Sequence, residues 1–256
     1  MVITSKDNEL VKHVRKLKDK KYRDEYNSFI IEGLKMVEEA IKEKAKIEKI
    51  IICEEFLSDN LNQKELLYEL AKEDVAYVSE NVFKYITDVV SPQGILAIVQ
   101  KNEVDEISYK EDLFLILDNI QDPGNMGTIL RTADSVGLTQ IIIPKGAADC
   151  YNQKVVRSSM GAIFRINIIE TQDLVKTVKE LKKHKIKIYA TDLKTDKTIY
   201  DVSYKKTAIV IGNEANGVSK EILEIADERV KIPMRGKAES LNASVATGII
   251  LYNAIR

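Results

Sequence analysis

The sequence contains few of the residues that most often carry catalysis, metal binding or covalent cross-links. It has two cysteines, two histidines and no tryptophan in 256 residues. Cys53 and Cys150 lie far apart and form no C-x-x-C pair, so neither a disulfide framework nor a cysteine zinc site is predicted. His13 and His184 lie in lysine-rich segments, which favours surface positions over a histidine base or histidine metal ligands. We therefore expect a protein that needs no metal and resides in a reducing compartment.

Long apolar segments and a net charge are also missing. No apolar run approaches the roughly 20 residues of a membrane span, and the opening residues MVITSKDNEL contain no signal-peptide core. The chain has 39 Lys and Arg against 40 Asp and Glu, a formal net charge of −1, so its overall charge does not indicate a polyanionic partner. These features predict a cytoplasmic, soluble protein that does not bind membranes.

Positive charge is nevertheless concentrated in one place. Residues 11–23, VKHVRKLKDKKYR, contain seven Lys and Arg but a single Asp. A run of this kind is usually the solvated face of a helix, but it also suits contact with nucleic-acid phosphates. The run alone leaves both interpretations open.

From Phe29 onward, apolar segments of strand length alternate with helical patterns, interrupted by the polar stretch 101–112. We predict two domains, residues 1–103 and 104–256. Continuous apolar strands between helices predict an α/β fold, with a largely parallel sheet covered on both faces in the second domain. The expected strands are 29–33, 46–53, 76–79, 94–100, 113–120, 140–144, 165–170, 185–192, 207–212 and 229–233. The expected helices are 34–45, 63–73, 80–90, 127–137, 151–159, 173–184, 219–226 and 241–256.

Three strand-to-helix junctions of the second domain are rich in Gly, Asn and small polar residues. They are DNIQDPGNMGTILRTAD at 118–134, IVIGNEANGVSKE at 209–221 and IPMRGKAESLNAS at 232–244. No P-loop sequence occurs, and no G-x-G-x-x-G follows the first strand. One such junction would be ordinary loop chemistry, but three junctions following strands of one parallel sheet favour a ligand site beyond the carboxyl ends of its strands.

These three segments resemble motifs 1, 2 and 3 of the SpoU/TrmH family of RNA 2′-O-methyltransferases, within the SPOUT superfamily. The first domain is similar to the family's substrate-binding domain, an α/β fold like that of certain ribosomal proteins, through FIIEG at 29–33 and SPQGILAIV at 91–99. The resemblance implies an enzyme that uses S-adenosylmethionine and acts as a homodimer. It also implies a trefoil knot in the C-terminal parallel-sheet domain, which general rules of chain topology would not predict.

The resemblance assigns roles to individual residues. Arg131 corresponds to the arginine beside the reacting 2′-hydroxyl, and because a guanidinium stays protonated, holding phosphate and stabilising an alkoxide suit it better than acting as a base. Asn125 and Asn242 are expected to brace loops, Glu214 to orient Arg131 or the loops, and Ser240 to cap the last helix or contact substrate. The positions implied to border the cofactor are Thr191, Gly212, Ile232 and Leu241.

Because the whole chain is not basic, the resemblance favours RNA contact for the basic run. The candidates are Lys12, Arg15, Lys16, Lys18, Lys20, Lys21 and Arg23, extended in the second domain by Lys145, Lys154, Arg157, Arg165 and Arg235. In the last predicted helix one apolar face is expected to serve core packing and a dimer interface together. That face consists of Leu241, Val245, Gly248, Ile249 and Tyr252.

We therefore predict methyl transfer from S-adenosylmethionine to a ribose 2′-hydroxyl in RNA, with large-subunit ribosomal RNA favoured over tRNA. Two other functions stay open. One is a non-catalytic RNA-binding or ribosome-assembly protein on the same fold, against which the intact set of Asn125, Arg131, Glu214 and Asn242 argues. The other is a nucleotide-dependent α/β enzyme that binds NAD or ATP instead.

Overall fold

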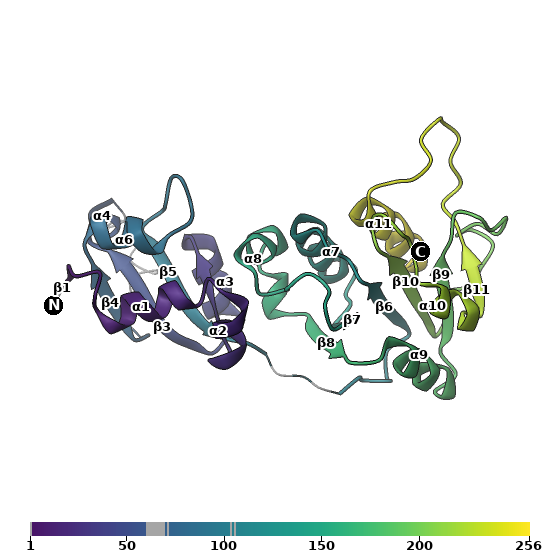
Figure 1. Cartoon of the computed structure of the whole chain (residues 1–256), viewed down its shortest axis with the longest axis horizontal. Helices are drawn as coiled ribbons and strands as arrows, with labels where there is room; N and C mark the ends of the chain where they lie inside the picture. Colours follow the sequence, from purple (N-terminus) through teal and green to yellow (C-terminus); the bar gives the residue numbers. More distant parts are fainter. Residues whose placement is uncertain (1, 60–69, 71, 103, 105) are drawn as a thin grey trace. The chain divides into compact units, whose positions relative to one another are not determined.

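The chain forms two compact α/β units in a computed structural model (Figure 1). Unit 1 comprises residues 1–101 together with 151–164, and unit 2 comprises residues 102–150 and 165–256. The structure describes residues 2–59, 70, 72–102, 104 and 106–256, so the helix expected over 63–73 lies largely outside the described residues. The division into domains 1–103 and 104–256 along the chain stays a prediction.

Unit 1 is built around a mixed sheet. Its described residues form five strands in the order β1-β4-β3-β5-β2. β5 runs antiparallel to β2 and β3, whereas β4 runs parallel to β1 and β3. The uninterrupted apolar sequence of β5 fits its interior place between β3 and β2, because both of its faces are covered. The strands are β1 (Val2–Ile3), β2 (Ser28–Glu32), β3 (Ile47–Cys53), β4 (Val75–Val78) and β5 (Ile95–Gln100).

Two short capped helices contain the basic run. Asn8 caps α1 by accepting from the backbone N–H of Leu10, and Asp19 caps α2 by accepting from that of Lys21. The helix expected from residue 80 ends at Ile86. Among the described residues of unit 1 the helices are α1 (Glu9–Lys16), α2 (Lys20–Glu25), α3 (Leu34–Lys42), α4 (Glu54–Asp59), α6 (Glu80–Ile86) and α8 (Gln153–Ser159).

The segment 151–164 belongs to unit 1 although it is flanked in sequence by unit 2. The ring of Phe29 on β2 lies 4.9 Å from that of Tyr151 and 6.4 Å from that of Phe164, measured between centroids. The helical pattern of YNQKVVRSS does not reveal this partner, because it shows one apolar face without showing what covers it.

Unit 2 contains the predicted parallel sheet. Its described residues form six strands in the order β11-β9-β10-β6-β7-β8, and every pairing among them is parallel. The predicted α/β class is therefore confirmed. The strands are β6 (Leu113–Asp118), β7 (Gln140–Pro144), β8 (Asn167–Thr171), β9 (Lys187–Thr191), β10 (Thr207–Gly212) and β11 (Glu228–Val230).

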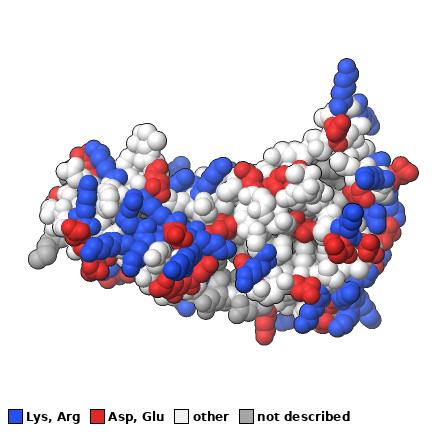
Figure 2. All heavy atoms as spheres, in the orientation of Figure 1, with Lys and Arg blue, Asp and Glu red and all other residues white. Residues whose placement is uncertain are grey.

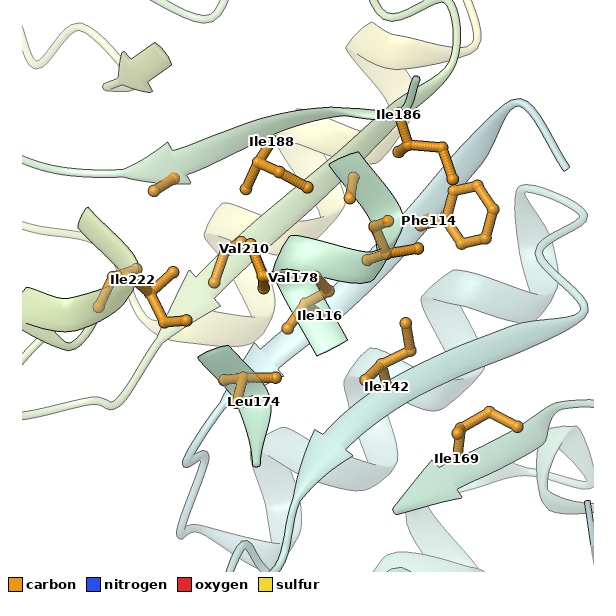
Figure 3. Packing of buried hydrophobic residues seen from close by; sticks show 14 residues of the cluster. Phe114, Ile116, Ile142, Ile169, Leu174, Val178, Ile186, Ile188, Val210 and Ile222 are labelled. Atoms are coloured by element: carbon orange, nitrogen blue, oxygen red, sulfur yellow. The ribbon is translucent and has the colours of Figure 1, made fainter. Parts of the chain in front are cut away.

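Helices cover both faces of this sheet. On one face α9 (Leu174–Lys183) and α10 (Lys220–Ile225) pack over buried side chains of the strands, such as Ile116 and Val210 (Figure 3). The remaining helices, α7 (Pro123–Ser135) and α11 (Ala243–Ala254), pack against one another, and α11 also contacts β10. Within the described residues no helix combines the length and the apolar character that crossing a bilayer requires.

Candidate active site

The three motif loops leave the same edge of the sheet in unit 2. β10 pairs with β6 so that Gly212 lies opposite Asp118, and β11 pairs with β9 so that Val230 lies opposite Thr191. β9 and β10 are also neighbours. Because all four strands are parallel, the loops that follow them start from one edge, the usual ligand side of such sheets.

Glu214 joins the second loop to the first. Its Oε2 accepts a hydrogen bond from the backbone N–H of Gln121 at 3.1 Å. Its Oε1 accepts from the backbone N–H of Asp122 at 3.1 Å and from Nδ2 of Asn125 at 3.0 Å. Oδ1 of Asn125 in turn accepts from Nδ2 of Asn242 at 2.8 Å. An unbroken chain of hydrogen bonds thus connects all three motif loops.

The same bonds lower the pKa of the central carboxylate. Partial burial alone would raise the pKa of Glu214, but the hydrogen bonds from Asn125, Gln121 and Asp122 outweigh it and lower the pKa below the usual 4.5. Glu214 is therefore ionised at neutral pH and acts as an acceptor for these donors. The alternative that Glu214 holds the loops is the one that the structure supports, since no bond links it to Arg131 among the described residues.

Two of the three helices that follow the motif loops begin with a side-chain cap. Asp122 accepts from the backbone N–H of Asn125 at 2.8 Å and caps α7. Asn242 accepts from the backbone N–H groups of Ser244 at 2.9 Å and Val245 at 3.3 Å and caps α11. The predicted cap at Ser240 is wrong, because Asn caps as well as Ser does and Asn242 stands directly before the helix. Ser240 is exposed, two residues earlier.

Arg131 lies exposed on α7. Its guanidinium forms no hydrogen bond or ion pair with any residue that the structure describes. Arg165 differs in this respect, because its guanidinium donates to both carboxylate oxygens of Asp134, with Nη2 at 2.9 Å from Oδ2. Of these two arginines, Arg131 is thus the one available for an external anion.

Gly212 is required by close backbone packing. A Cβ at this position would lie 2.0 Å from the carbonyl carbon of Gly217 and 2.1 Å from the nitrogen of Val218. The loop closes on itself through hydrogen bonds between the backbones of Asn213 and Gly217, at 3.0 and 2.9 Å. The turn is therefore packed tightly against the end of β10.

The other predicted cofactor positions lie on neighbouring segments of unit 2, one before this turn in the sequence and two after it. Thr191 ends the neighbouring strand β9, half-buried, and its hydroxyl donates to the carbonyl of Val210 at 3.1 Å. Ile232 and Leu241, both half-buried, lie near the two ends of the loop between β11 and α11. Figure 1 shows this loop projecting from the body of unit 2.

A second set of hydrogen bonds, which the sequence does not predict, holds the second motif loop. Oδ2 of the buried Asp118 accepts from the backbone N–H of Ser219 at 2.7 Å. Nδ2 of Asn213 donates to the carbonyl of Asn119, whose φ is +65°, at 2.9 Å. These bonds hold both ends of the second motif loop against the end of β6. A polar Asp-Asn pair directly after the buried run LFLIL is the signal that could have indicated them.

In the basic run of unit 1, some cationic side chains are bound to other residues of the protein and others are exposed without an ion pair among the described residues. Arg23 is buried and donates to the carbonyls of Leu17 at 2.8 Å and Lys18 at 2.7 Å. The structure therefore contradicts an RNA contact at Arg23, whose guanidinium stabilises the α1–α2 turn instead. Lys18 is paired with Asp88 at 2.6 Å, and Lys12 with Glu9 at 3.0 Å.

The available cations lie on the outer surface of the two helices. Lys16, Lys20 and Lys21 are exposed and form no ion pair within the described part of the chain. Arg15 is also exposed, although its Nη1 donates to the carbonyl of Tyr85 at 3.2 Å. Figure 2 shows Lys and Arg side chains gathered over this part of unit 1.

Comparisons with known proteins agree with both units. Residues 112–252 match the SpoU rRNA Methylase family, and residues 8–97 match the MRM3-like substrate binding domain. The chain is 35% identical over 253 residues to the 23S rRNA (guanosine(2553)-2′-O)-methyltransferase RlmP of Bacillus subtilis (strain 168), covering 98% of both chains. It is 34% identical over 193 residues to the 23S rRNA (guanosine-2′-O-)-methyltransferase RlmB of Xanthomonas axonopodis pv. citri (strain 306), covering 72% of this chain and 78% of that one. The crystal structure of an AdoMet-bound rRNA methyltransferase from Sinorhizobium meliloti superposes with a TM-score of 0.87 at 31% identity, covering 99% of this chain and 97% of that one.

Proposed function

Because the chain belongs to the SpoU rRNA methylase family, we propose that it transfers a methyl group from S-adenosylmethionine to a ribose 2′-hydroxyl of large-subunit ribosomal RNA. The observation that carries the proposal is the hydrogen-bonded chain Glu214–Asn125–Asn242, which joins the three motif loops at the ligand edge of the sheet. The relatives RlmP and RlmB, both named for 23S rRNA, support ribosomal RNA over tRNA. Both come from bacteria, whose ribosomal RNA is cytoplasmic, and we place this enzyme in the cytoplasm as well.

The residues at the edge of the sheet fit the cofactor. S-adenosylmethionine, when bound, supplies an electrophilic methyl group on a sulfonium sulfur, a leaving group that needs no protonation. Gly212 and its turn would border the adenosine through backbone groups, since the turn leaves no room for a side chain at that position. Thr191, Ile232 and Leu241 would complete the border. The family's trefoil knot is proposed for unit 2 from the family match over residues 112–252.

Arg131 is the residue proposed to act on the reacting ribose. As the 2′-hydroxyl loses its proton to water, negative charge develops on its oxygen, and a nearby guanidinium stabilises that charge. The same planar group can hold the adjoining phosphate. Glu214 is a poor acceptor for this proton, because its oxygens already accept three N–H groups and its pKa is lowered. Its proposed role is to position Asn125 and the loops.

The face predicted for dimerisation is exposed in the single chain. Val245, Ile249 and Tyr252 on α11 are 50%, 36% and 55% exposed, whereas the buried side chains of this helix are Thr247, Ile250 and Leu251. The prediction that the face packs in the core is therefore wrong for Val245, Ile249 and Tyr252. An apolar helical face left uncovered supports the proposed homodimer.

The proposal is tested with methyl-labelled S-adenosylmethionine and separate samples of large-subunit rRNA and tRNA. Label should enter rRNA as a 2′-O-methylated nucleotide after digestion, and Arg131→Ala should abolish most of it. Binding of rRNA without any label would favour the non-catalytic protein. A rise in melting temperature with NAD or ATP, but none with S-adenosylhomocysteine, would favour the other nucleotide-dependent enzyme.

A further inference from the structure

Three aromatic rings form a ladder on the surface of unit 1, between α1 and α2. The rings of His13 and Tyr26 meet edge to face, with centroids 4.8 Å apart and planes at 68°. Tyr22 stacks nearly parallel to Tyr26, with centroids 6.1 Å apart and planes at 13°. All three side chains are partly exposed. We call this set the α1–α2 ladder, and Tyr22 is the ring at its end.

Two ammonium groups lie over that terminal ring. Nζ of Lys16 is 5.6 Å and Nζ of Lys21 is 5.5 Å from the centroid of Tyr22. Both distances approach the limit of about 6 Å at which a cation still interacts with a ring. Neither lysine has an acidic partner within the described part of the chain, so both can exchange the ring for a phosphate at little cost.

We propose that Tyr22 is a stacking platform for one unpaired base of the RNA substrate. The ammonium groups of Lys16 and Lys21 would move from the ring to the phosphates on either side of that nucleotide. The base would continue the Tyr26–Tyr22 stack, and basic side chains beside aromatic rings are the usual means of holding single-stranded nucleic acid. The proposal rests on the proposed function, because it assumes that unit 1 binds the RNA.

The platform also defines the form of RNA that unit 1 takes. In a duplex the base faces are covered by neighbouring base pairs, and only the edges and the backbone are accessible. A ring that receives a base face therefore selects a loop, a bulge or a strand end. The recognised element of the ribosomal RNA would be single-stranded where it meets α2.

Tyr85 provides an internal contrast. Its ring is covered by the guanidinium of Arg15 at 4.7 Å and the ammonium of Lys6 at 4.8 Å. Arg15 is also anchored by its hydrogen bond to the carbonyl of Tyr85, at 3.2 Å, so it cannot leave without breaking that bond. Tyr85 is thus an exposed tyrosine beside cations whose ring is not free for stacking, and it serves as the matched control.

The test measures the contribution of bases apart from that of phosphates. Fluorescence anisotropy of the full chain would give the affinity for a short single-stranded RNA and for the same backbone made abasic. The wild type should bind the natural strand about 5- to 150-fold more tightly, the range for stacking of one base. Tyr22→Ala should reduce this ratio close to one, whereas Tyr22→Phe and Tyr85→Ala should keep it. Replacing Lys16 and Lys21 by Ala should weaken binding of both strands alike.

The outcomes separate the platform from the enzyme. A Tyr22→Ala variant that melts like the wild type and keeps the full ratio overturns the platform, even if labelled methyl still enters rRNA. A ratio of one in the wild type overturns it as well. If the wild type binds no RNA and transfers no methyl group, the proposed function itself fails. Stronger binding to duplex than to single-stranded RNA would also overturn the platform, because it would mean that the basic surface contacts only the phosphate backbone.

Discussion

At the scale of single residues, Arg131 can be replaced without breaking any hydrogen bond or ion pair of its side chain within the described chain. Arg131→Ala should lower the rate of methyl transfer by about 100- to 1000-fold, as expected when one group that stabilises a developing oxyanion is removed. The melting temperature and the affinity for S-adenosylhomocysteine should not change. Single-turnover methylation and thermal unfolding measure the two effects. Full activity in this variant would exclude Arg131 from the site.

Glu214 should make cofactor binding sensitive to acid. Its pKa in the folded protein lies below the usual 4.5, so its charge stabilises the loop arrangement fully above that value. This stabilisation is lost as the pH falls through the lower pKa of the folded state. Glu214→Gln should bind S-adenosylhomocysteine more weakly at neutral pH, because its amide N–H opposes a backbone donor, and it should lack the acid-dependent loss. Titration calorimetry from neutral to acidic pH would compare S-adenosylhomocysteine binding by the wild type and by Glu214→Gln. Identical pH profiles would show that the charge of Glu214 does not contribute to cofactor binding.

Some of these residue roles can be predicted from the sequence and others cannot. The alternation of apolar strands and polar loops places Asn125 and Asn242 at one edge of a parallel sheet. Their mutual hydrogen bond joins positions 117 residues apart, and only the tertiary structure brings those side chains together. Likewise, a run of cations does not indicate which one turns inward, so the sequence predicts a surface position for Arg23 although this residue is buried.

At the scale of elements, two glycines of one turn offer a controlled comparison. Gly212→Ala would place a Cβ 2.0 Å from backbone, which only a shift of the whole turn relieves, whereas a Cβ at Gly217 meets nothing within 4 Å. Gly217→Ala carries only the left-handed φ of +70°, at a cost of about 1–2 kcal/mol. Gly212→Ala should cost about 3 kcal/mol or more and abolish S-adenosylhomocysteine binding. Denaturant unfolding and calorimetry would rank them, and equal effects would contradict the packing argument.

Helix α11 should separate assembly from folding. Val245→Glu alters a half-exposed side chain, so the unfolding free energy of the single chain should change by less than about 0.5 kcal/mol while the dimer dissociates. Leu251→Ala removes a fully buried side chain and should cost about 2–5 kcal/mol of stability. Sedimentation velocity with denaturant unfolding distinguishes the two. A Val245→Glu protein with the mass of the wild-type assembly would locate the interface elsewhere.

The helix starts show why element boundaries are harder to predict than element types. The segment before Gly127 contains Asp, Pro, Gly and Asn and has the composition of a loop, and the pattern predicts a helix only from that residue. α7 begins at Pro123, because Asp122 caps it and a proline is well suited to the first helical position, where no N–H is needed. The same residue types occur in loops and in the first turn of a helix at such junctions. Here the hydrogen bond from the backbone N–H of Asn125 to Asp122 marks the start of the helix.

At the scale of the whole molecule, RNA binding should depend on a few lysines although the chain carries a net charge of only −1. Replacing Lys16, Lys20 and Lys21 by Ala should weaken binding and reduce the log–log salt slope by roughly 0.7 for each phosphate of single-stranded RNA that is no longer neutralised. Replacing Lys176 and Lys179, exposed on α9, changes the net charge in the same direction and is the control. Filter binding across a salt series gives both slopes. Equal slopes in the two variants would make the basic run a solvated surface.

The place of residues 151–164 in unit 1 has a consequence for synthesis of the protein. A chain emerges from the ribosome from its first residue onward, and domains ordinarily fold in that order. Here the ring of Phe29 receives its partners Tyr151 and Phe164 only after the first strands of unit 2 have also been made. At about 5–20 residues per second, unit 1 waits several seconds with part of its surface uncovered. The nascent unit 1 is therefore exposed to premature association until the middle of unit 2 has left the ribosome.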